Sequence, residues 1–271
     1  MSRPDPRSDV RPDPRPLVLA LHSSGAGARQ WQAYPSRLDP SWRWMATDLL
    51  GYGPDAAWPA GQTTSLDAEA QHVAPALGAT GQAPVHLVGH SYGGTVALQL
   101  ALRWPQRVAS VTLYEPVRFA LLQQRDARLW REIVAAGRWI GALALAGDVD
   151  ASARAFVDYW SGPQAWPGLS PARRAGIARR MPKVQAEFEA LFADNVPFDA
   201  YGALTMPLRI VCGTASPAPA RRVAERLAMA CPRAELIRWA GADHMAPLTQ
   251  PDRFAALLPC AAGHERASDA A

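Results

Sequence analysis

A serine flanked by glycines is the residue of this chain best placed to carry out covalent chemistry. Ser91 lies in the sequence GHSYGG of residues 89–94, directly after an apolar run at 85–88 and directly before an apolar, helix-forming stretch at 95–102. This order predicts a tight turn from a strand into a helix, with the serine hydroxyl projecting above the sheet. We therefore expect Ser91 to be a nucleophile. The alternative is a glycine-rich loop with an incidental serine.

A serine hydroxyl is a weak nucleophile at neutral pH and needs a general base within hydrogen-bond reach. His244 is the best candidate, because it follows the last expected strand in the sequence AGADHMAP of residues 240–247. The alternative is that His244 only caps the turn after it. The other histidines fall where a backbone-shaping, strand, helix-surface or tail position is expected: His22, His72, His86, His90 and His264.

Short apolar runs alternate with helix-forming stretches along most of the chain. Strands are expected at 17–21, 42–47, 85–88, 108–114, 208–212 and 235–239. Helices are expected around 30–38, 65–77, after Ser91, and at 218–231 and 252–258. No hairpin turn separates the strands, so the fold class predicted is α/β, with a mostly parallel central sheet and helices on both faces. Active sites of such sheets lie outside the carboxyl ends of the strands, where Ser91 and His244 both fall.

The alternation stops near Arg118 and gives way to a helical, tryptophan-rich stretch that lasts to about Tyr201. We therefore expect a core made of residues 17–117 and 202–260, and an inserted helical cap at 118–201. Residues 1–16 are rich in Arg, Pro and Asp and predict a disordered tail, because they cannot bury enough apolar surface to become ordered. Residues 261–271 predict a second flexible tail.

Composition excludes several classes of protein. The chain has 271 residues, a formal net charge of +4 and three cysteines. The cysteines lack the spacing of a metal site, and their odd, scattered number favours reduced thiols and a cytoplasmic protein. No leader and no apolar run of about 18 residues is present, so neither export nor membrane insertion is expected. The dispersed arginines do not form a nucleic-acid platform. We expect no metal and no cofactor, and the oligomeric state is left open.

The order of these motifs resembles the α/β-hydrolase superfamily over residues 17–116 and 205–259. The sequence HSSG at 22–25 resembles its H-G-x-G oxyanion loop, and DLLGYG at 48–53 is similar to its D-x-x-G-x-G segment. The resemblance implies that the backbone N–H groups of Ser24 and Tyr92 form an oxyanion hole. Ser23 stands where the family usually has glycine, which leaves open whether Ser23 or Ser24 turns its amide inward. Asp48 is expected to anchor its loop rather than to catalyse.

The acid that orients the histidine departs from the family pattern. Members usually carry it three residues after the glycine that ends the penultimate strand, and here Ser216 occupies that position after Gly213. Serine carries no charge near neutral pH. Some members place the acid after the strand that follows the serine's strand, and the resemblance then implies Glu115. The alternatives are that Glu115 caps the next helix or pairs with a cap arginine such as Arg118.

The residues and the resemblance together predict a serine hydrolase that cleaves a carboxylic ester or related acyl bond through an acyl-enzyme. Ser91 attacks the carbonyl carbon, His244 moves the proton, and Glu115 holds the ring. The aromatic-rich cap suits a small to medium apolar acyl substrate. A thioesterase, a carbon–carbon bond hydrolase and a cofactor-free perhydrolase are alternatives within the fold. A non-catalytic ligand-binding protein is the alternative from another class.

Overall fold

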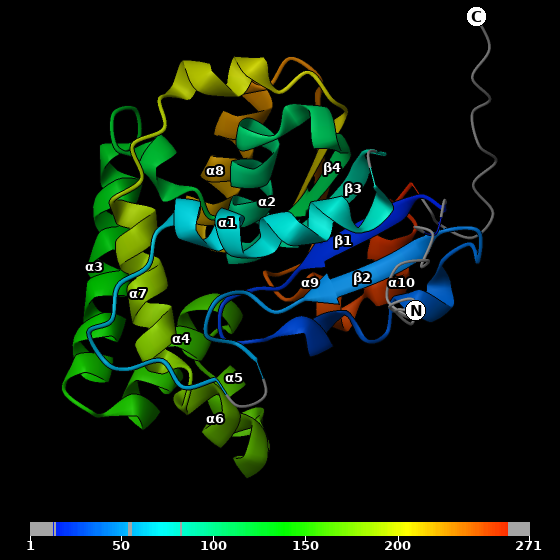
Figure 1. Cartoon of the computed structure of the whole chain (residues 1–271). Coiled ribbons are helices and arrows are strands. Elements are labelled where there is room, and N and C mark those ends of the chain that lie inside the picture. Colours follow the sequence, from blue (N-terminus) through cyan, green and yellow to red (C-terminus); the bar gives the residue numbers. More distant parts are fainter. Residues whose placement is uncertain (1–12, 14, 54–55, 82, 260–271) are drawn as a thin grey trace, which may run out of the picture.

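The computed structural model describes residues 13, 15–53, 56–81 and 83–259. Most of the N-terminal tail predicted at 1–16, and all of the C-terminal tail predicted at 261–271, lie outside these residues. The described part of the chain forms a layered α/β arrangement, in which one central sheet is covered by helices on both sides (Figure 1).

The sheet of the described residues has six strands in the order β2-β1-β3-β4-β5-β6, and every neighbouring pair is parallel. Their bounds are β1 Leu17–Leu21, β2 Arg43–Thr47, β3 Val85–His90, β4 Val108–Tyr114, β5 Leu208–Gly213 and β6 Ala234–Trp239. The parallel sheet predicted from the continuous apolar runs is confirmed. Because β3 lies between β1 and β4, and β5 lies beside β4, the loops after these strands meet at one edge.

The two faces of the sheet bury two separate apolar clusters, and this explains why β1 is apolar at every position. Leu17, Leu19 and Leu21 contribute to the cluster beneath α1, α2 and α8, whereas Val18 and Ala20 contribute to the cluster beneath α9 and α10. Figure 1 shows these two groups of helices on opposite sides of the strands. The helices of the two faces are α1 Leu66–Leu77, α2 Tyr92–Arg103, α8 Ala218–Ala230, α9 Ala246–Thr249 and α10 Pro251–Ala255.

The helix predicted around 30–38 is wrong. Two short 3₁₀ helices occupy this stretch, η1 at Ala28–Trp31 and η2 at Pro35–Arg37. Pro35 has no N–H to donate and so interrupts a continuous helix. The rings of Trp31 and Tyr34, 4.9 Å apart between centroids, are buried in the second apolar cluster instead. The other 3₁₀ helices are η3 Gly78–Thr80, η4 Pro105–Arg107, η5 Phe119–Leu122 and η6 Phe198–Ala203.

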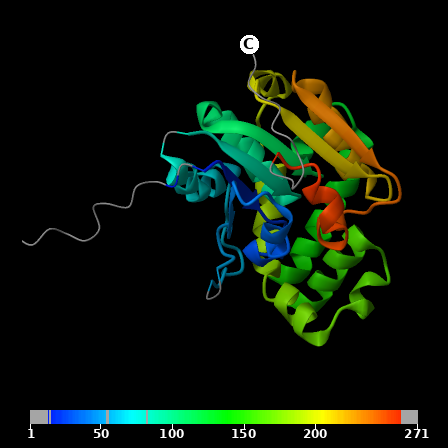
Figure 2. The same ribbon diagram turned by 90° about the vertical axis from the view of Figure 1, so that its right-hand side faces the viewer.

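Five α-helices lie between β4 and β5, and we call residues 119–203 the helical insertion. Its α-helices are α3 Ala127–Leu145, α4 Val149–Ser161, α5 Ala165–Gly168, α6 Pro171–Ala178 and α7 Met181–Phe192. Figure 2 shows them as a green to yellow-green layer at one end of the sheet. Gly137 of α3 lets α7 approach closely, because a Cβ there would lie 2.7 Å from the Phe192 ring. The long helical stretch predicted from the sequence is therefore present.

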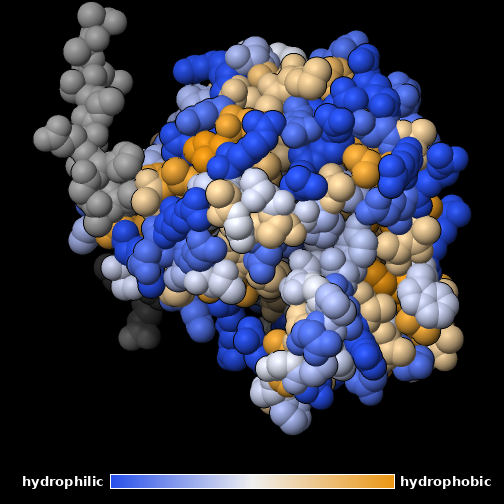
Figure 3. Space-filling model, turned by 180° about the vertical axis from the view of Figure 1, so that it is seen from behind, coloured by the Kyte–Doolittle hydropathy of each residue, from blue (hydrophilic) through white to orange (hydrophobic). Residues whose placement is uncertain are grey.

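The surface seen from behind is mixed in character. Hydrophilic residues cover most of this face, with apolar residues in small groups between them (Figure 3). No helix among the described residues combines the length and the apolar composition that crossing a bilayer requires.

The start of α2 packs against the end of β1 without room for a side chain. A Cβ on Gly93 would lie 2.4 Å from the carbonyl oxygens of Leu21 and His22. We predict that Gly93→Ala lowers the free energy of unfolding by more than about 2 kcal/mol, since backbone atoms on both sides must move. Equilibrium denaturation in urea measures this change.

Gly176→Ala is the matched control, because a Cβ at this position of α6 would meet nothing within 4 Å. Alanine there should leave stability unchanged or raise it by up to about 1 kcal/mol, the usual cost of glycine inside a helix. Equal effects of the two substitutions would contradict the steric argument.

Candidate active site

Ser91 occupies a strained turn between β3 and α2. Its φ is +55° and its ψ is −119°, a backbone conformation that costs a non-glycine residue about 1–3 kcal/mol. Its N–H donates to the carbonyl of Tyr114 at 3.0 Å, which ties the turn to the end of β4. Gly89 permits the turn, because a Cβ there would lie 2.5 Å from the Cα of Gly94. The hydroxyl is thus held at the carboxyl end of the sheet by the surrounding backbone.

Glu115 and His244 form a direct hydrogen bond at the same edge of the sheet. Glu115 Oε2 lies 2.6 Å from His244 Nδ1, and both residues are buried. The other carboxylate oxygen, Oε1, accepts hydrogen bonds from the Gly213 N–H at 2.6 Å and from the Ser216 hydroxyl at 2.5 Å. Ser216, which occupies the position where the family usually has its acid, is therefore a donor to Glu115.

The sequence left open that Glu115 caps the next helix or pairs with Arg118. Neither role agrees with the contacts that Glu115 makes. Arg118 pairs with Asp194 at 2.7 Å and donates to Gln99 Oε1 at 2.7 Å. The helix that follows, η5, has Arg118 at its N-cap position. Glu115 itself has a φ of +45°, so the chain turns sharply at the end of β4 and directs the carboxylate toward β5.

The loop that carries His244 is fixed from two sides. The Tyr114 hydroxyl donates to the carbonyl of Asp243 at 2.7 Å, and His90 Nε2 donates to the carbonyl of His244 at 2.8 Å. Above the imidazole, Trp160 of α4 stacks on the His244 ring with centroids 4.1 Å apart and planes inclined by 23°. Trp160 also lines a narrow pocket together with Ser91, so one side chain contacts the imidazole and borders the pocket of the serine.

Among the hydrogen bonds of the described residues, none joins Ser91 Oγ to the His244 ring. Hydrogen bonds of this kind are often long in unliganded enzymes and tighten when substrate binds.

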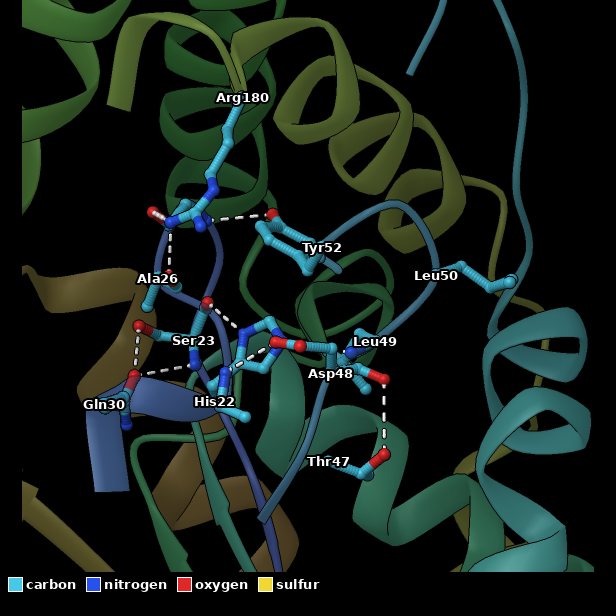
Figure 4. A network of polar contacts seen from close by, with 12 residues as sticks. His22, Ser23, Ala26, Gln30, Thr47, Asp48, Leu49, Leu50, Tyr52 and Arg180 are labelled. Carbon is cyan, nitrogen blue, oxygen red and sulfur yellow. Dashed lines mark hydrogen bonds and ion pairs between the residues drawn. The ribbon is translucent and has the colours of Figure 1, made fainter. Parts of the chain in front are cut away.

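The loop after β1, which the sequence predicts to be an oxyanion loop, is held by a network of polar contacts (Figure 4). The N–H and hydroxyl of Ser23 both donate to Gln30 Oε1, at 2.9 Å and 2.8 Å. Ser24 instead lines the pocket beside Ser91. Because the Ser23 amide is already engaged, Ser24 is the better candidate for an inward amide. The Tyr92 N–H belongs to the first turn of α2, where amides have no partner within the helix.

Three further contacts hold this loop from outside. Arg180, at the start of α7, donates to the carbonyl oxygens of Gly25 and Ala26. Asp48 Oδ1 accepts from the Ala28 N–H at 2.7 Å, so Asp48 contacts the loop as an anchor. The Tyr52 hydroxyl accepts from the Gly25 N–H at 2.9 Å.

Comparison with known proteins agrees with the α/β fold of this chain. The sequence profile of the "Alpha/beta hydrolase family" matches residues 17–257. The chain belongs to this family. A hydrolase structure from Pseudomonas aeruginosa PA01 shares its fold, with a TM-score of 0.70, 23% identity, and coverage of 89% of this chain and 87% of that chain.

Two curated relatives of this α/β hydrolase are named as an esterase and as a hydrolase. A pimeloyl-[acyl-carrier protein] methyl ester esterase of Aromatoleum aromaticum is 28% identical over 258 residues, which cover 90% of this chain and 97% of the relative. A 2-hydroxy-6-oxononadienedioate/2-hydroxy-6-oxononatrienedioate hydrolase of Klebsiella pneumoniae is 35% identical over 107 residues, covering 37% of this chain and 36% of the relative. The matches to the first relatives span only about a quarter to a third of those proteins' length (27%, 36% and 36%).

A buried ionic cluster beside the pocket was not found from the sequence. Lys183 of α7 lies 2.6 Å from Glu69 Oε1 of α1 and 3.0 Å from Glu187 Oε1 of α7. All three side chains are at most 1% exposed. We call Glu69, Lys183 and Glu187 the ionic cluster. Its one sequence signal is that Lys183 is the only lysine of an arginine-rich chain. Trp160 was also missed as a contact of His244, because aromatic spacing alone cannot separate core from site.

The loop-shaping histidines of this α/β hydrolase are buried and neutral. His22 Nε2 accepts from the Leu49 N–H at 3.0 Å, so Nδ1 carries the proton and donates to the Ser23 carbonyl at 2.8 Å. Burial lowers the pKa of His22 to about 4. Burial, followed by the charge on His244, lowers the pKa of His90 well below its ordinary value. In β3, burial likewise lowers the pKa of His86 to about 4.

These shifts predict how stability depends on pH. The unfolded chain takes up protons near pH 6.5, whereas His22 and His86 stay neutral in the folded protein until about pH 4. Stability is therefore full above pH 6.5 and falls as the pH drops toward 4, by about 1.4 kcal/mol per pH unit for each buried histidine. His86→Gln should reduce this slope in urea denaturation, and His72→Gln, on an exposed position of α1, should not. An unchanged slope in His86→Gln would contradict the argument.

Proposed function

We propose that this α/β hydrolase is a serine hydrolase that cleaves a carboxylic ester or related acyl bond through an acyl-enzyme. The observation that carries the proposal is the hydrogen bond of 2.6 Å between Glu115 Oε2 and His244 Nδ1, beside a serine held in a strained turn. A carboxylate on Nδ1 fixes the tautomer in which Nε2 is free to accept a proton. A protein that only binds a ligand has no need of this arrangement.

Each residue then has a defined task. Ser91 Oγ attacks the carbonyl carbon while His244 Nε2 takes its proton, and the backbone amides of Ser24 and Tyr92 bind the oxyanion of the tetrahedral intermediate. His244 next gives the proton to the leaving alcohol, and the C–O bond breaks. Water, deprotonated by the same imidazole, then releases the acid from Ser91. Glu115 stabilises the imidazolium in both half-reactions.

The lining of the narrow pocket beside Ser91 supports a mostly apolar substrate. Aliphatic and aromatic side chains, all but Val117 from the helical insertion, form most of its lining together with Ser24 and Ser91: Val117, Phe119, Phe156, Trp160, Val184, Phe188 and Leu191. We propose that the helical insertion, residues 119–203, acts as the cap of this pocket. The thiols of Cys212 and Cys231, both free and buried, are consistent with a reducing, cytoplasmic setting.

Ester cleavage is favoured over carbon–carbon bond hydrolysis by two observations. The methyl ester esterase aligns with 90% of this chain, whereas the dienedioate hydrolase aligns with 37% of it. The pocket also contains the carboxylate of Glu187, which would repel a dicarboxylate such as a dienedioate. Thioesterase and perhydrolase activities use the same residues and remain alternatives, which a panel of esters and thioesters of graded chain length separates.

The first prediction from this proposal concerns the nucleophile. A fluorophosphonate probe should label the wild-type protein covalently, and Ser91→Ala should remove the label, because Ser91 is the proposed nucleophile that His244 activates. Intact-protein mass spectrometry measures the added mass. Ser24→Ala is the control that keeps the backbone amide and should still be labelled. Equal labelling of wild type and Ser91→Ala would remove the proposal.

The second prediction concerns the acid. Glu115→Gln should lower kcat by about 10³–10⁴-fold, because the neutral amide stabilises neither the required tautomer nor the imidazolium. Glu235→Gln is the matched control, since Glu235 lies on β6 with a side chain 61% exposed, paired only with Arg209. Its activity should equal that of the wild type. A Glu115→Gln enzyme within a few-fold of wild type would return Glu115 to a structural role.

A further inference from the structure

The pocket beside Ser91 contains one charged side chain among the described residues that line it, and that side chain is not fully paired. Glu187 of α7 is 1% exposed and lines the pocket together with Ser24 and Ser91. Its Oε1 accepts from Lys183 at 3.0 Å, whereas its Oε2 is buried and has no hydrogen-bond partner within 3.5 Å. A buried carboxylate oxygen without a partner is costly, because it has lost water and gained no donor.

Lys183 and Glu69, the other members of the ionic cluster, have contacts that do not involve Glu187 Oε2. Lys183 is paired with Glu69 at 2.6 Å and is enclosed by aromatic rings, those of Tyr52, Trp58 and Tyr92, at 5.0–5.5 Å from Nζ. Glu69 accepts from Leu50 N–H at 3.1 Å with its second oxygen. Glu187 Oε2 is therefore the carboxylate oxygen of the ionic cluster that has no hydrogen bond of its own, on a residue that lines the pocket.

The net charge of the ionic cluster also favours a hydrogen-bond donor at Glu187. One ammonium faces two carboxylates, so the cluster has a formal excess of one negative charge. Burial raises the pKa of Glu69 more than Lys183 lowers it. Burial, then the charge of Glu187 and a side-chain hydrogen bond to Glu187, raise the pKa of Tyr52 well above its ordinary value, so the Tyr52 hydroxyl stays protonated beside this carboxylate. A ligand that brings a hydrogen-bond donor to Glu187 would offset this excess, and one that brings another carboxylate would increase it.

We propose that Glu187 Oε2 is a specificity site, at which the substrate places a hydrogen-bond donor, a hydroxyl or an ammonium group, on the part that faces α7. This inference rests on the proposed function, because it names a feature of the substrate that Ser91 attacks. Apolar side chains contact the rest of the substrate, and Glu187 discriminates by the group at its end. The hydrogen bond from Lys183 to Glu187 Oε1 holds Glu187 in place when the donor is absent.

Matched substrates test this inference on the wild-type enzyme. Activated esters of one chain length are compared that differ only in a terminal methyl, hydroxyl, ammonium or carboxylate group, placed either on the acyl chain or on the alcohol. We expect kcat/KM to be at least about ten-fold higher for hydroxyl or ammonium than for methyl in one of the two series, the effect of one hydrogen bond to a charged group. The carboxylate ester should be the poorest substrate. A larger gain for ammonium than for hydroxyl indicates that charge contributes beyond the hydrogen bond.

Glu187→Gln and Glu189→Gln form the matched pair of variants. Both substitutions remove one negative charge from α7, but Glu189 is exposed and lies outside the pocket lining. Glu187→Gln should remove most of the preference for the donor and reduce the discrimination against carboxylate, measured as ratios of kcat/KM between the matched esters. Glu189→Gln should keep the wild-type preferences. Circular dichroism checks that both variants are folded.

The outcomes separate the two proposals. If wild type hydrolyses the methyl, hydroxyl and ammonium esters equally well in both series, the specificity role of Glu187 is overturned, while the hydrolase assignment stands. This comparison needs no variant and so remains decisive if Glu187→Gln does not fold. If wild type hydrolyses none of the esters and Ser91 is not labelled by the fluorophosphonate, the proposed function itself fails.

Discussion

The site depends on a carboxylate buried between two strands. Glu115 leaves the end of β4 and reaches toward β5, where the Gly213 amide, the Ser216 hydroxyl and the His244 ring all donate to it. An isolated carboxylate at this depth would be strongly destabilising, and three donors offset the loss of water. The loop after β6, the end of β5 and the turn that carries Ser91 are thereby held in one constellation, and the imidazole has one orientation rather than several.

The fold was largely predictable because its signals are local. The runs at 17–21 and 108–114 are apolar at most positions since they are covered on both faces, and the glycines around Ser91 mark a turn in which a side chain cannot fit. The helix predicted at 30–38 was wrong because Trp31 and Tyr34 pack into the second apolar cluster and Pro35 interrupts a helix. These two effects outweigh the helical pattern of the sequence. Boundaries for a separate cap remain a prediction.

The order of the site residues along the chain was predictable from the sequence. The contacts between their side chains were less so. A serine in a glycine-flanked turn and a histidine after the last strand are visible as motifs, and the absence of an acid at 216 directed attention to Glu115. The burial of Lys183 between Glu69 and Glu187 could not be predicted, because the pairing joins α1 to α7 over more than a hundred residues of sequence. Stacking of Trp160 on His244 is of the same kind, since neither position carries a local signal.

The donation from Ser216 to Glu115 has a consequence for how such sites diverge. Adjacent strands β4 and β5 offer two places from which an acid can reach one imidazole. Two anions at the distance that now separates Ser216 Oγ from Glu115 Oε1, 2.5 Å, would repel each other strongly in a buried setting, so one of two such acids would be held protonated. A hydroxyl at residue 216 avoids this repulsion and acts as a supporting donor to the acid on the neighbouring strand.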